Sequence, residues 1–233
     1  MKNNLNFETY LFISQKKFTI SVFAVTHEKI YQNEFVFENE KIEIDFEKLD
    51  RFLDKNIFKI EKLLQNFVNH IVVILELDNF FPVELSIKKN DYKDTIVSNN
   101  IKYLLSEAKD CIQQSLDKES IIHILINNYN IDGNDYSYLP QETKGNCFSI
   151  DLKFICLSNK LMESIEKILR KYHISLNQVV SSKYVKSFLT ENENDIFILT
   201  KKILDGYNQN EVKLIAKTQK NHGFFEKFFN FFN

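Results

Sequence analysis

The chain has 233 residues, of which 44% are hydrophobic and 27% are charged, as is usual for a globular protein with one large domain or two small ones. A net charge of -2 argues against nucleic-acid binding through bulk electrostatics. With only 4 Gly, a nucleotide-binding enzyme is also disfavoured, because glycines let the backbone approach a phosphate closely. The three cysteines, Cys111, Cys147 and Cys156, form no CxxC pair, so buried thiols are expected rather than disulfides or a zinc site.

The first third of the chain predicts strands around one long helix. Apolar residues alternate over residues 10–25 with two lysines in the middle, which predicts two short strands or a hairpin. Residues 28–37 predict the next strand, and residues 42–46 either extend the sheet or lead into a helix. Apolar residues spaced by three and four predict a helix over residues 46–69, and a short buried strand follows over residues 70–77.

The middle of the chain predicts the order β-α-β-β-α. The expected elements are a strand over 83–88, a helix over 99–115, strands over 120–131 and 147–157, and a helix over 158–172. We interpret this segment, residues 83–175, as a small domain inserted into a second α/β unit. That unit consists of residues 1–82 and 176–204, so the fold class is mixed α/β.

Three weaker elements and a polar stretch complete the body of the chain. Residues 176–180 read as extended, residues 184–189 as helical and residues 196–199 as a short strand. From residue 205 to residue 221 the chain is mostly polar, which predicts a linker (205–221) to the C-terminal segment.

No part of the body predicts a membrane span or an export signal. The longest apolar run, residues 71–75, is far shorter than the ~20 residues that a transmembrane helix needs. Residues 1–10 lack the uninterrupted apolar core of a signal peptide. We therefore expect a cytoplasmic protein.

The last twelve residues, 222–233, predict an amphipathic helix. At about 100° per residue, six phenylalanines lie on one side and the polar residues lie on the other. A helix this short is marginal in water and forms where its rings are buried. Full burial of each Phe is worth ~1.5–3 kcal/mol, of which interfacial insertion gives a part, and each nearby lysine adds about 1 kcal/mol against an anionic leaflet. The predicted membrane-binding residues are Phe224, Phe225, Phe228, Phe229, Phe231, Phe232, Lys220 and Lys227.

Two alternatives to the membrane are open for these rings. One is packing of the helix against the protein's own core, and the other is docking of the helix into a groove of a partner. The polar stretch that separates the helix from the last apolar element favours the membrane.

Three stretches, in order along the chain, resemble one family. The first is IIHILI at 121–126, followed by YNIDG at 129–133 and a loop with Pro140 and Gly145. The second consists of residues 148–155, 161–171 and 176–180. The third is NEVKLI at 210–215, a lysine-rich spacer, and GFFEKFF at 223–229. In this order they are similar to the inserted subdomain and the membrane-targeting tail of FtsA, an actin-like protein that ties the bacterial division ring to the inner membrane.

The resemblance implies half of an actin-like (ribonuclease H-like) lobe that carries an inserted SHS2-like domain. It implies a membrane-tethered scaffold of cell division on the inner face of the cell membrane at midcell. The implied partners are the anionic inner membrane, FtsA or other division proteins, and a second copy of the chain. A second reading is a PilM-like pilus or secretion adaptor, which binds a peptide from a membrane partner.

The chain departs from the family in the two loops that bind phosphate there. Residues 11–17 stand in place of the family's D-x-G-T-x-K phosphate hairpin and contain neither its Asp nor its Gly. No D-x-G-G-G-T loop follows residues 196–199, and the chain is too short for the second lobe. No nucleotide cofactor, metal, ATPase activity or direct FtsZ binding is therefore expected.

A third reading is a small membrane-associated hydrolase whose site the sequence does not reveal. For this reading, His123 and Asp132 are the candidate pair of a base and its orienting acid. Without a nucleophile motif nearby, we interpret them as a satisfied strand histidine and an Asx turn.

Overall fold

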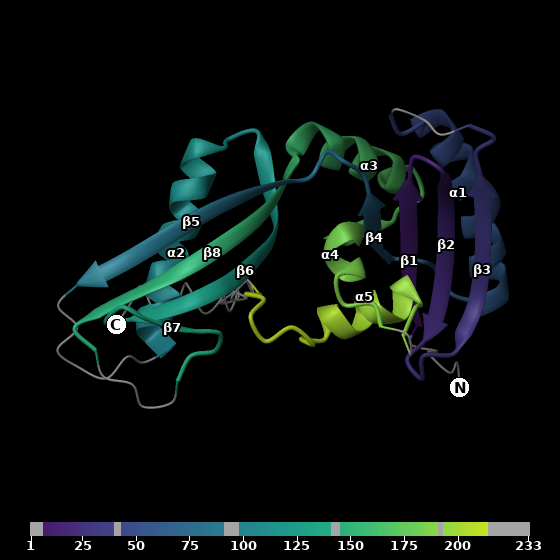
Figure 1. Cartoon of the computed structure of the whole chain (residues 1–233). Helices are drawn as coiled ribbons and strands as arrows, with labels where there is room; N and C mark the ends of the chain where they lie inside the picture. Colours follow the sequence, from purple (N-terminus) through teal and green to yellow (C-terminus); the bar gives the residue numbers. More distant parts are fainter. Residues whose placement is uncertain (1–6, 40–42, 91–97, 141–144, 191–192, 214–233) are drawn as a thin grey trace, which may run out of the picture.

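The computed structural model describes residues 7–39, 43–90, 98–140, 145–190 and 193–213. Within these ranges the chain forms two β-sheets that lie side by side, each covered by helices (Figure 1). The strand orders are β3-β2-β1-β4-β9 in the first sheet and β5-β8-β6-β7 in the second. The predicted mixed α/β class is confirmed.

The first sheet begins with the predicted hairpin. Strands β1 (Phe7–Ser14), β2 (Lys17–Ala24) and β3 (Lys29–Val36) are antiparallel neighbours, and β4 (His70–Glu76) and β9 (Ser175–Ser181) run parallel to β1. Only the second strand therefore opposes the direction of the others. This arrangement agrees with the half of an actin-like (ribonuclease H-like) lobe that the resemblance implied.

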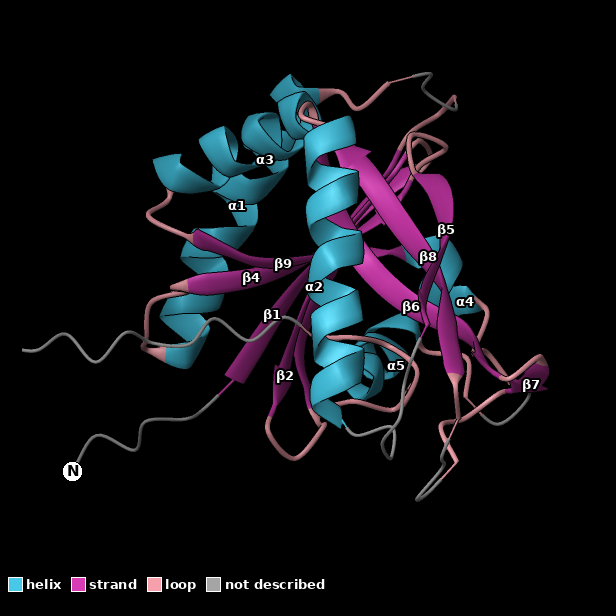
Figure 2. Ribbon diagram, turned by 90° about the vertical axis from the view of Figure 1, so that its left-hand side faces the viewer, coloured by secondary structure: helices cyan, strands magenta, loops and turns pink. Residues whose placement is uncertain are grey.

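Helices cover both faces of the first sheet, so its central strands are apolar on both sides. On one face, α1 (Phe46–Leu64) and α3 (Asn159–Lys171) pack over Leu11 and Ile13 of β1, and Figure 2 shows these two helices together. On the other face, α4 (Ser182–Lys186) and α5 (Ile196–Leu204) pack over Tyr10 and Phe12.

The second sheet has one buried face and one face that is mostly polar. Its elements are β5 (Phe81–Asn90), α2 (Ser98–Ser115), β6 (Glu119–Ile131), β7 (Asn134–Tyr136) and β8 (Cys147–Ser158). Helix α2 covers the face on which β8 places its even-numbered apolar side chains. The core there consists of Leu104, Ala108, Ile112, Ile124, Ile126, Tyr129, Ile131, Phe148, Ile150, Leu152, Phe154 and Cys156.

The prediction of a strand over residues 196–199 was wrong, because this run begins helix α5. The Asp195 side chain caps the helix by accepting hydrogen bonds from the backbone N–H groups of Phe197 (2.9 Å) and Ile198 (3.4 Å). A short apolar run does not separate a strand from a buried helical turn. The Asp195 cap and the packing of Phe197 and Ile203 against the first sheet favour the helix.

Helix α3 was assigned to the inserted segment 83–175, and the packing corrects this boundary. Its buried residues Ile165, Ile168 and Leu169 belong to the same core as α1 and the first sheet. Lys171 Nζ lies 2.6 Å from a carboxylate oxygen of Asp50 on α1. The inserted segment therefore ends with β8, because the apolar face of α3 packs in the core of the first sheet.

Candidate functional site

The eight residues predicted to bind a membrane, Lys220, Phe224, Phe225, Lys227, Phe228, Phe229, Phe231 and Phe232, lie outside the described residues. Their role stays a prediction. Among the residues that the structure describes, no helix is long and apolar enough to cross a membrane. The same part of the chain holds no group of three His, Cys, Asp or Glu side chains placed to bind a metal ion.

The described part of the predicted linker is not free of the body. Its residues 208–213, which we call the strap, run along the edge of β6. The N–H of Ile126 donates to the carbonyl oxygen of Asn210 at 2.8 Å, and the N–H of Val212 donates to that of Ile124 at 2.8 Å. The strap therefore extends the second sheet by one short antiparallel pairing, and the prediction of a linker was wrong for these residues.

A buried polar cluster joins the strap to both sheets. His123 of β6 accepts a hydrogen bond from the backbone N–H of Ser181 at Nε2 (3.1 Å), so Nδ1 carries the proton and donates to Glu211 Oε1 (2.7 Å). The other oxygen of Glu211 accepts from the hydroxyl of Tyr184 at 2.9 Å. Asn208 Nδ2 donates to that same hydroxyl oxygen at 2.8 Å.

The cluster draws on three parts of the fold. His123 lies on the second sheet, Tyr184 on α4 over the first sheet, and Glu211 on the strap. Burial raises the pKa of the Tyr184 hydroxyl. The hydrogen bond from Asn208 lowers this pKa, and the charge of Glu211 raises it. Tyr184 therefore stays protonated and donates. The cluster therefore bridges the two sheets and the strap.

His123 and Asp132 have separate partners. The Asp132 carboxylate accepts hydrogen bonds from the backbone N–H groups of Asn146 (2.9 Å) and Cys147 (2.7 Å) and closes a turn. No contact between the two residues makes a base and its orienting acid, which agrees with the interpretation of His123 and Asp132 as structural residues.

An apolar groove opens beside the cluster, where the two sheets meet. It encloses about 530 Å³, within the range of ligand pockets. We call it the junction groove. Its apolar lining comes from β5, β6, β8 and α4, and its amide groups come largely from the strap. Lining residues include Phe80, Phe81, Pro82, Leu125, Ile155, Tyr184, Phe188, Asn127, Asn208 and Asn210.

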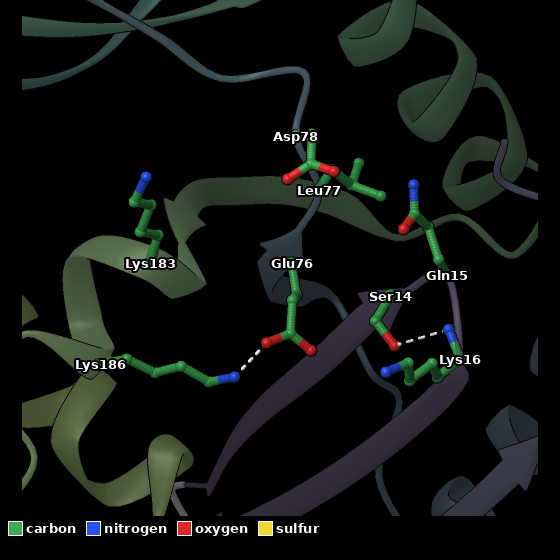
Figure 3. Close-up of a pocket in the computed structure, with 8 residues that line it drawn as sticks. All are labelled: Ser14, Gln15, Lys16, Glu76, Leu77, Asp78, Lys183 and Lys186. Carbon is green, nitrogen blue, oxygen red and sulfur yellow. Dashed lines mark hydrogen bonds and ion pairs between the residues drawn. The ribbon is translucent and has the colours of Figure 1, made fainter. Parts of the chain in front are cut away.

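A second hollow, of about 460 Å³, lies at the carboxyl ends of the parallel strands β1 and β4 (Figure 3). Ligands of open α/β sheets commonly bind at this edge. The hollow is lined by Ser14, Gln15, Lys16, Glu76, Leu77, Asp78, Lys183 and Lys186. It includes the residues that stand in place of the family's phosphate hairpin.

Several polar groups around this hollow are engaged with each other. The Ser14 hydroxyl accepts hydrogen bonds from the backbone N–H groups of Lys16 (3.2 Å) and Lys17 (3.0 Å). Figure 3 shows Glu76 and Lys186 directed toward one another across the hollow, where they form an ion pair. Two backbone N–H groups of this hairpin are thus directed at Ser14, and Lys186 of the hollow is paired with Glu76.

Comparisons with known proteins give likeness in structure alone. No family model matches the sequence, and neither does any curated protein. The cytoplasmic domain of EpsL, an inner membrane component of the type II secretion system of Vibrio cholerae, is 14% identical with a TM-score of 0.39, covering 77% of this chain and 59% of that one. The PilM-PilN type IV pilus biogenesis complex is 7% identical with a TM-score of 0.46, covering 76% and 48%.

A Bacteroides thetaiotaomicron protein with an actin-like ATPase fold and unknown function is also similar. It is 12% identical with a TM-score of 0.29, over 79% of this chain and 56% of that one. The chain thus spans between about half and three fifths of the length of these three proteins. At these identities and TM-scores the likeness does not assign a function.

Proposed function

We propose that this chain is a non-enzymatic adaptor, which binds a partner polypeptide in the junction groove and a membrane surface through its C-terminal segment. The observation that carries the proposal is the groove itself. Its lining combines apolar side chains with Lys153 and Lys183, and it comes from both sheets, α4 and the strap. In its lining, Asn127 on β6 is exposed and offers a donor and an acceptor for the backbone of an extended peptide. Asn208 and Asn210 already donate to Tyr184 and Ser137.

The hollow at the strand ends supports the non-enzymatic half of the proposal. A phosphate cradle needs backbone N–H groups that point into the site, and glycine allows the close approach. Here the Ser14 side chain takes up two of these N–H groups, and no glycine lines the hollow. Mg²⁺-ATP is therefore expected neither to bind there nor to be hydrolysed.

Two finer functions are compatible with this adaptor. The six-phenylalanine segment favours an FtsA-like scaffold of cell division, which binds division partners through the second sheet and the inner membrane through residues 222–233. The junction groove favours the alternative, a PilM-like pilus or secretion adaptor that holds a peptide of a membrane protein. A tagged protein recruited to midcell only when residues 222–233 are present supports the first. Recruitment elsewhere supports the second.

The groove is tested by selecting displayed twelve-residue peptides on the purified chain. Phe188 lines the groove, so Phe188→Asp should abolish binding of the selected peptides. Phe58, which is 70% exposed on α1, provides the matched control, and Phe58→Asp should bind them as the wild type does. Peptides that bind both variants equally would place the binding site away from the groove and refute this part of the proposal.

A further inference from the structure

The outer edge of β5 is unpaired in the part of the chain that the structure describes. β5 is the end strand of the second sheet and pairs with β8 on its inner side alone. Figure 1 shows it as the outermost strand, on the side of the second sheet away from the strap. A strand of 10 residues with a free edge presents a row of backbone donors and acceptors to another chain.

The two faces of β5 differ in a regular way. Its odd-numbered residues up to Ile87, namely Phe81, Val83, Leu85 and Ile87, are partly buried against α2 and the second core, and Lys89 is exposed. Its even-numbered residues, Pro82, Glu84, Ser86 and Lys88, are exposed on the opposite face. Pro82 has no N–H and suits an edge strand, while alternate residues between Val83 and Lys88 turn their backbone N–H and C=O groups to the outer edge.

The charges on the exposed face are self-complementary. Glu84 and Lys88 lie on either side of Ser86 at equal distance along the strand. When two antiparallel copies of β5 pair about a two-fold axis through Ser86, Glu84 of each copy faces Lys88 of the other. Leu85 then faces Ile87 on the α2 side. Two opposite-charge pairs and two apolar pairs form at once.

The other registers lack this match. An axis through Leu85 or Ile87 places no unlike charges opposite each other. An axis through Glu84 or Lys88 sets two like charges face to face, which destabilises the pairing. A slip by one residue in one copy exchanges its apolar and polar faces. One register is therefore strongly preferred.

We propose that the β5 edge is a homodimer interface, in which two copies of this chain pair β5 antiparallel about Ser86 and form one continuous eight-stranded sheet. Glu84 is 68% exposed and makes a long intramolecular contact of 3.8 Å to Lys153, so it is available to a partner. Because the contact is small and rests on exposed charges, the dimer is weak and is strengthened at low ionic strength.

The test is sedimentation equilibrium at low salt, up to about 1 mM protein. All variants carry Phe228→Asp and Phe229→Asp, so that the C-terminal rings do not cause association. Glu84→Lys or Lys88→Glu alone places two like-charge pairs in the dimer and should weaken it roughly tenfold. The double exchange Glu84→Lys with Lys88→Glu should restore the wild-type affinity. Lys59→Glu, on the exposed face of α1, should leave it unchanged.

A cross-link gives an independent measurement of the register. Directly opposed residues of antiparallel strands have Cα atoms about 4.5–5.5 Å apart, within reach of a disulfide. In a Cys111→Ser background, Ser86→Cys should form a disulfide-linked dimer, and Lys59→Cys should not. A chain that stays monomeric and does not cross-link at position 86 overturns the proposal. A dimer whose affinity is unchanged by Glu84→Lys and by Lys88→Glu also overturns the proposal, because such a dimer must use another surface.

Discussion

Removing the Glu211 carboxylate is the sharpest perturbation of the buried cluster. Glu211 is 8% exposed and its partner His123 is 0% exposed, so the lost acceptor comes from a site that is largely shielded from water. Glu211→Ala leaves two buried donors without partners, the Nδ1–H of His123 and the hydroxyl of Tyr184. A buried donor without an acceptor costs ~1–3 kcal/mol, so the free energy of unfolding should fall by about 3 kcal/mol.

Urea and thermal unfolding measure this change. For a chain of this size, about 3 kcal/mol corresponds to a fall of about 6–12 °C in Tm. Glu211→Gln keeps one acceptor oxygen and should lose about 1 kcal/mol. Glu107→Ala, at an exposed site on α2, is the matched control and should stay within about 0.5 kcal/mol of the wild type.

Amide hydrogen exchange shows where the loss occurs. In Glu211→Ala the amide of Val212, which donates to Ile124, should lose protection before the amides of β1 and β4, because the strap opens first. The reasoning would be refuted if Glu211→Ala had the same free energy of unfolding as the wild type and its Val212 amide were still protected from exchange. It would mean that the strap is held by its backbone pairing without the cluster.

Three further results are expected. Titration of the chain with Mg²⁺-ATP should give no heat of binding at about 1 mM nucleotide, because Ser14 occupies the hairpin N–H groups; saturable binding would contradict the proposed adaptor. Burial raises the pKa of the Cys156 thiol to about 11, so at pH 8 a thiol reagent should modify the exposed Cys111 and reach Cys156 only after unfolding. Rapid labelling of Cys156 in Cys111→Ser would disprove this. The hydrogen bond from Lys171 lowers the pKa of Asp50, so the stabilisation it gives is present above its unfolded value near 3.8 and is lost as the pH falls through the folded value. Asp50→Asn should therefore cost up to about 1 kcal/mol at pH 7 and nothing in strong acid; a cost independent of pH would point to another origin.

Local patterns predicted most of the elements. The alternation on either side of Lys16 and Lys17 gives the hairpin of β1 and β2, and apolar residues spaced by three and four give α1. These signals are carried by neighbours in sequence, so one chain suffices to read them. The incorrect prediction of a strand at α5 also comes from a local pattern, because four apolar residues in a row fit a strand or a buried helical turn equally well.

The site could not be predicted in the same way. The pairing of the strap with β6 joins Glu211 to His123, 88 positions apart, and no local pattern links them. One signal was present, since apolar Val212 between Glu211 and Lys213 is the alternation of a short strand. The lining of the junction groove comes from β5, β6, β8, β9, α4 and the strap, so it emerges only when both sheets are in place.

Vesicle flotation of a labelled groove-binding peptide tests the central claim, that one chain joins a polypeptide to a membrane. With anionic vesicles the wild type should carry the peptide to the top of the gradient. Phe188→Asp should float without the peptide, and Phe228→Asp with Phe229→Asp should hold the peptide and remain at the bottom. A wild type that stays below, or a peptide that floats equally well with Phe188→Asp, would contradict the account.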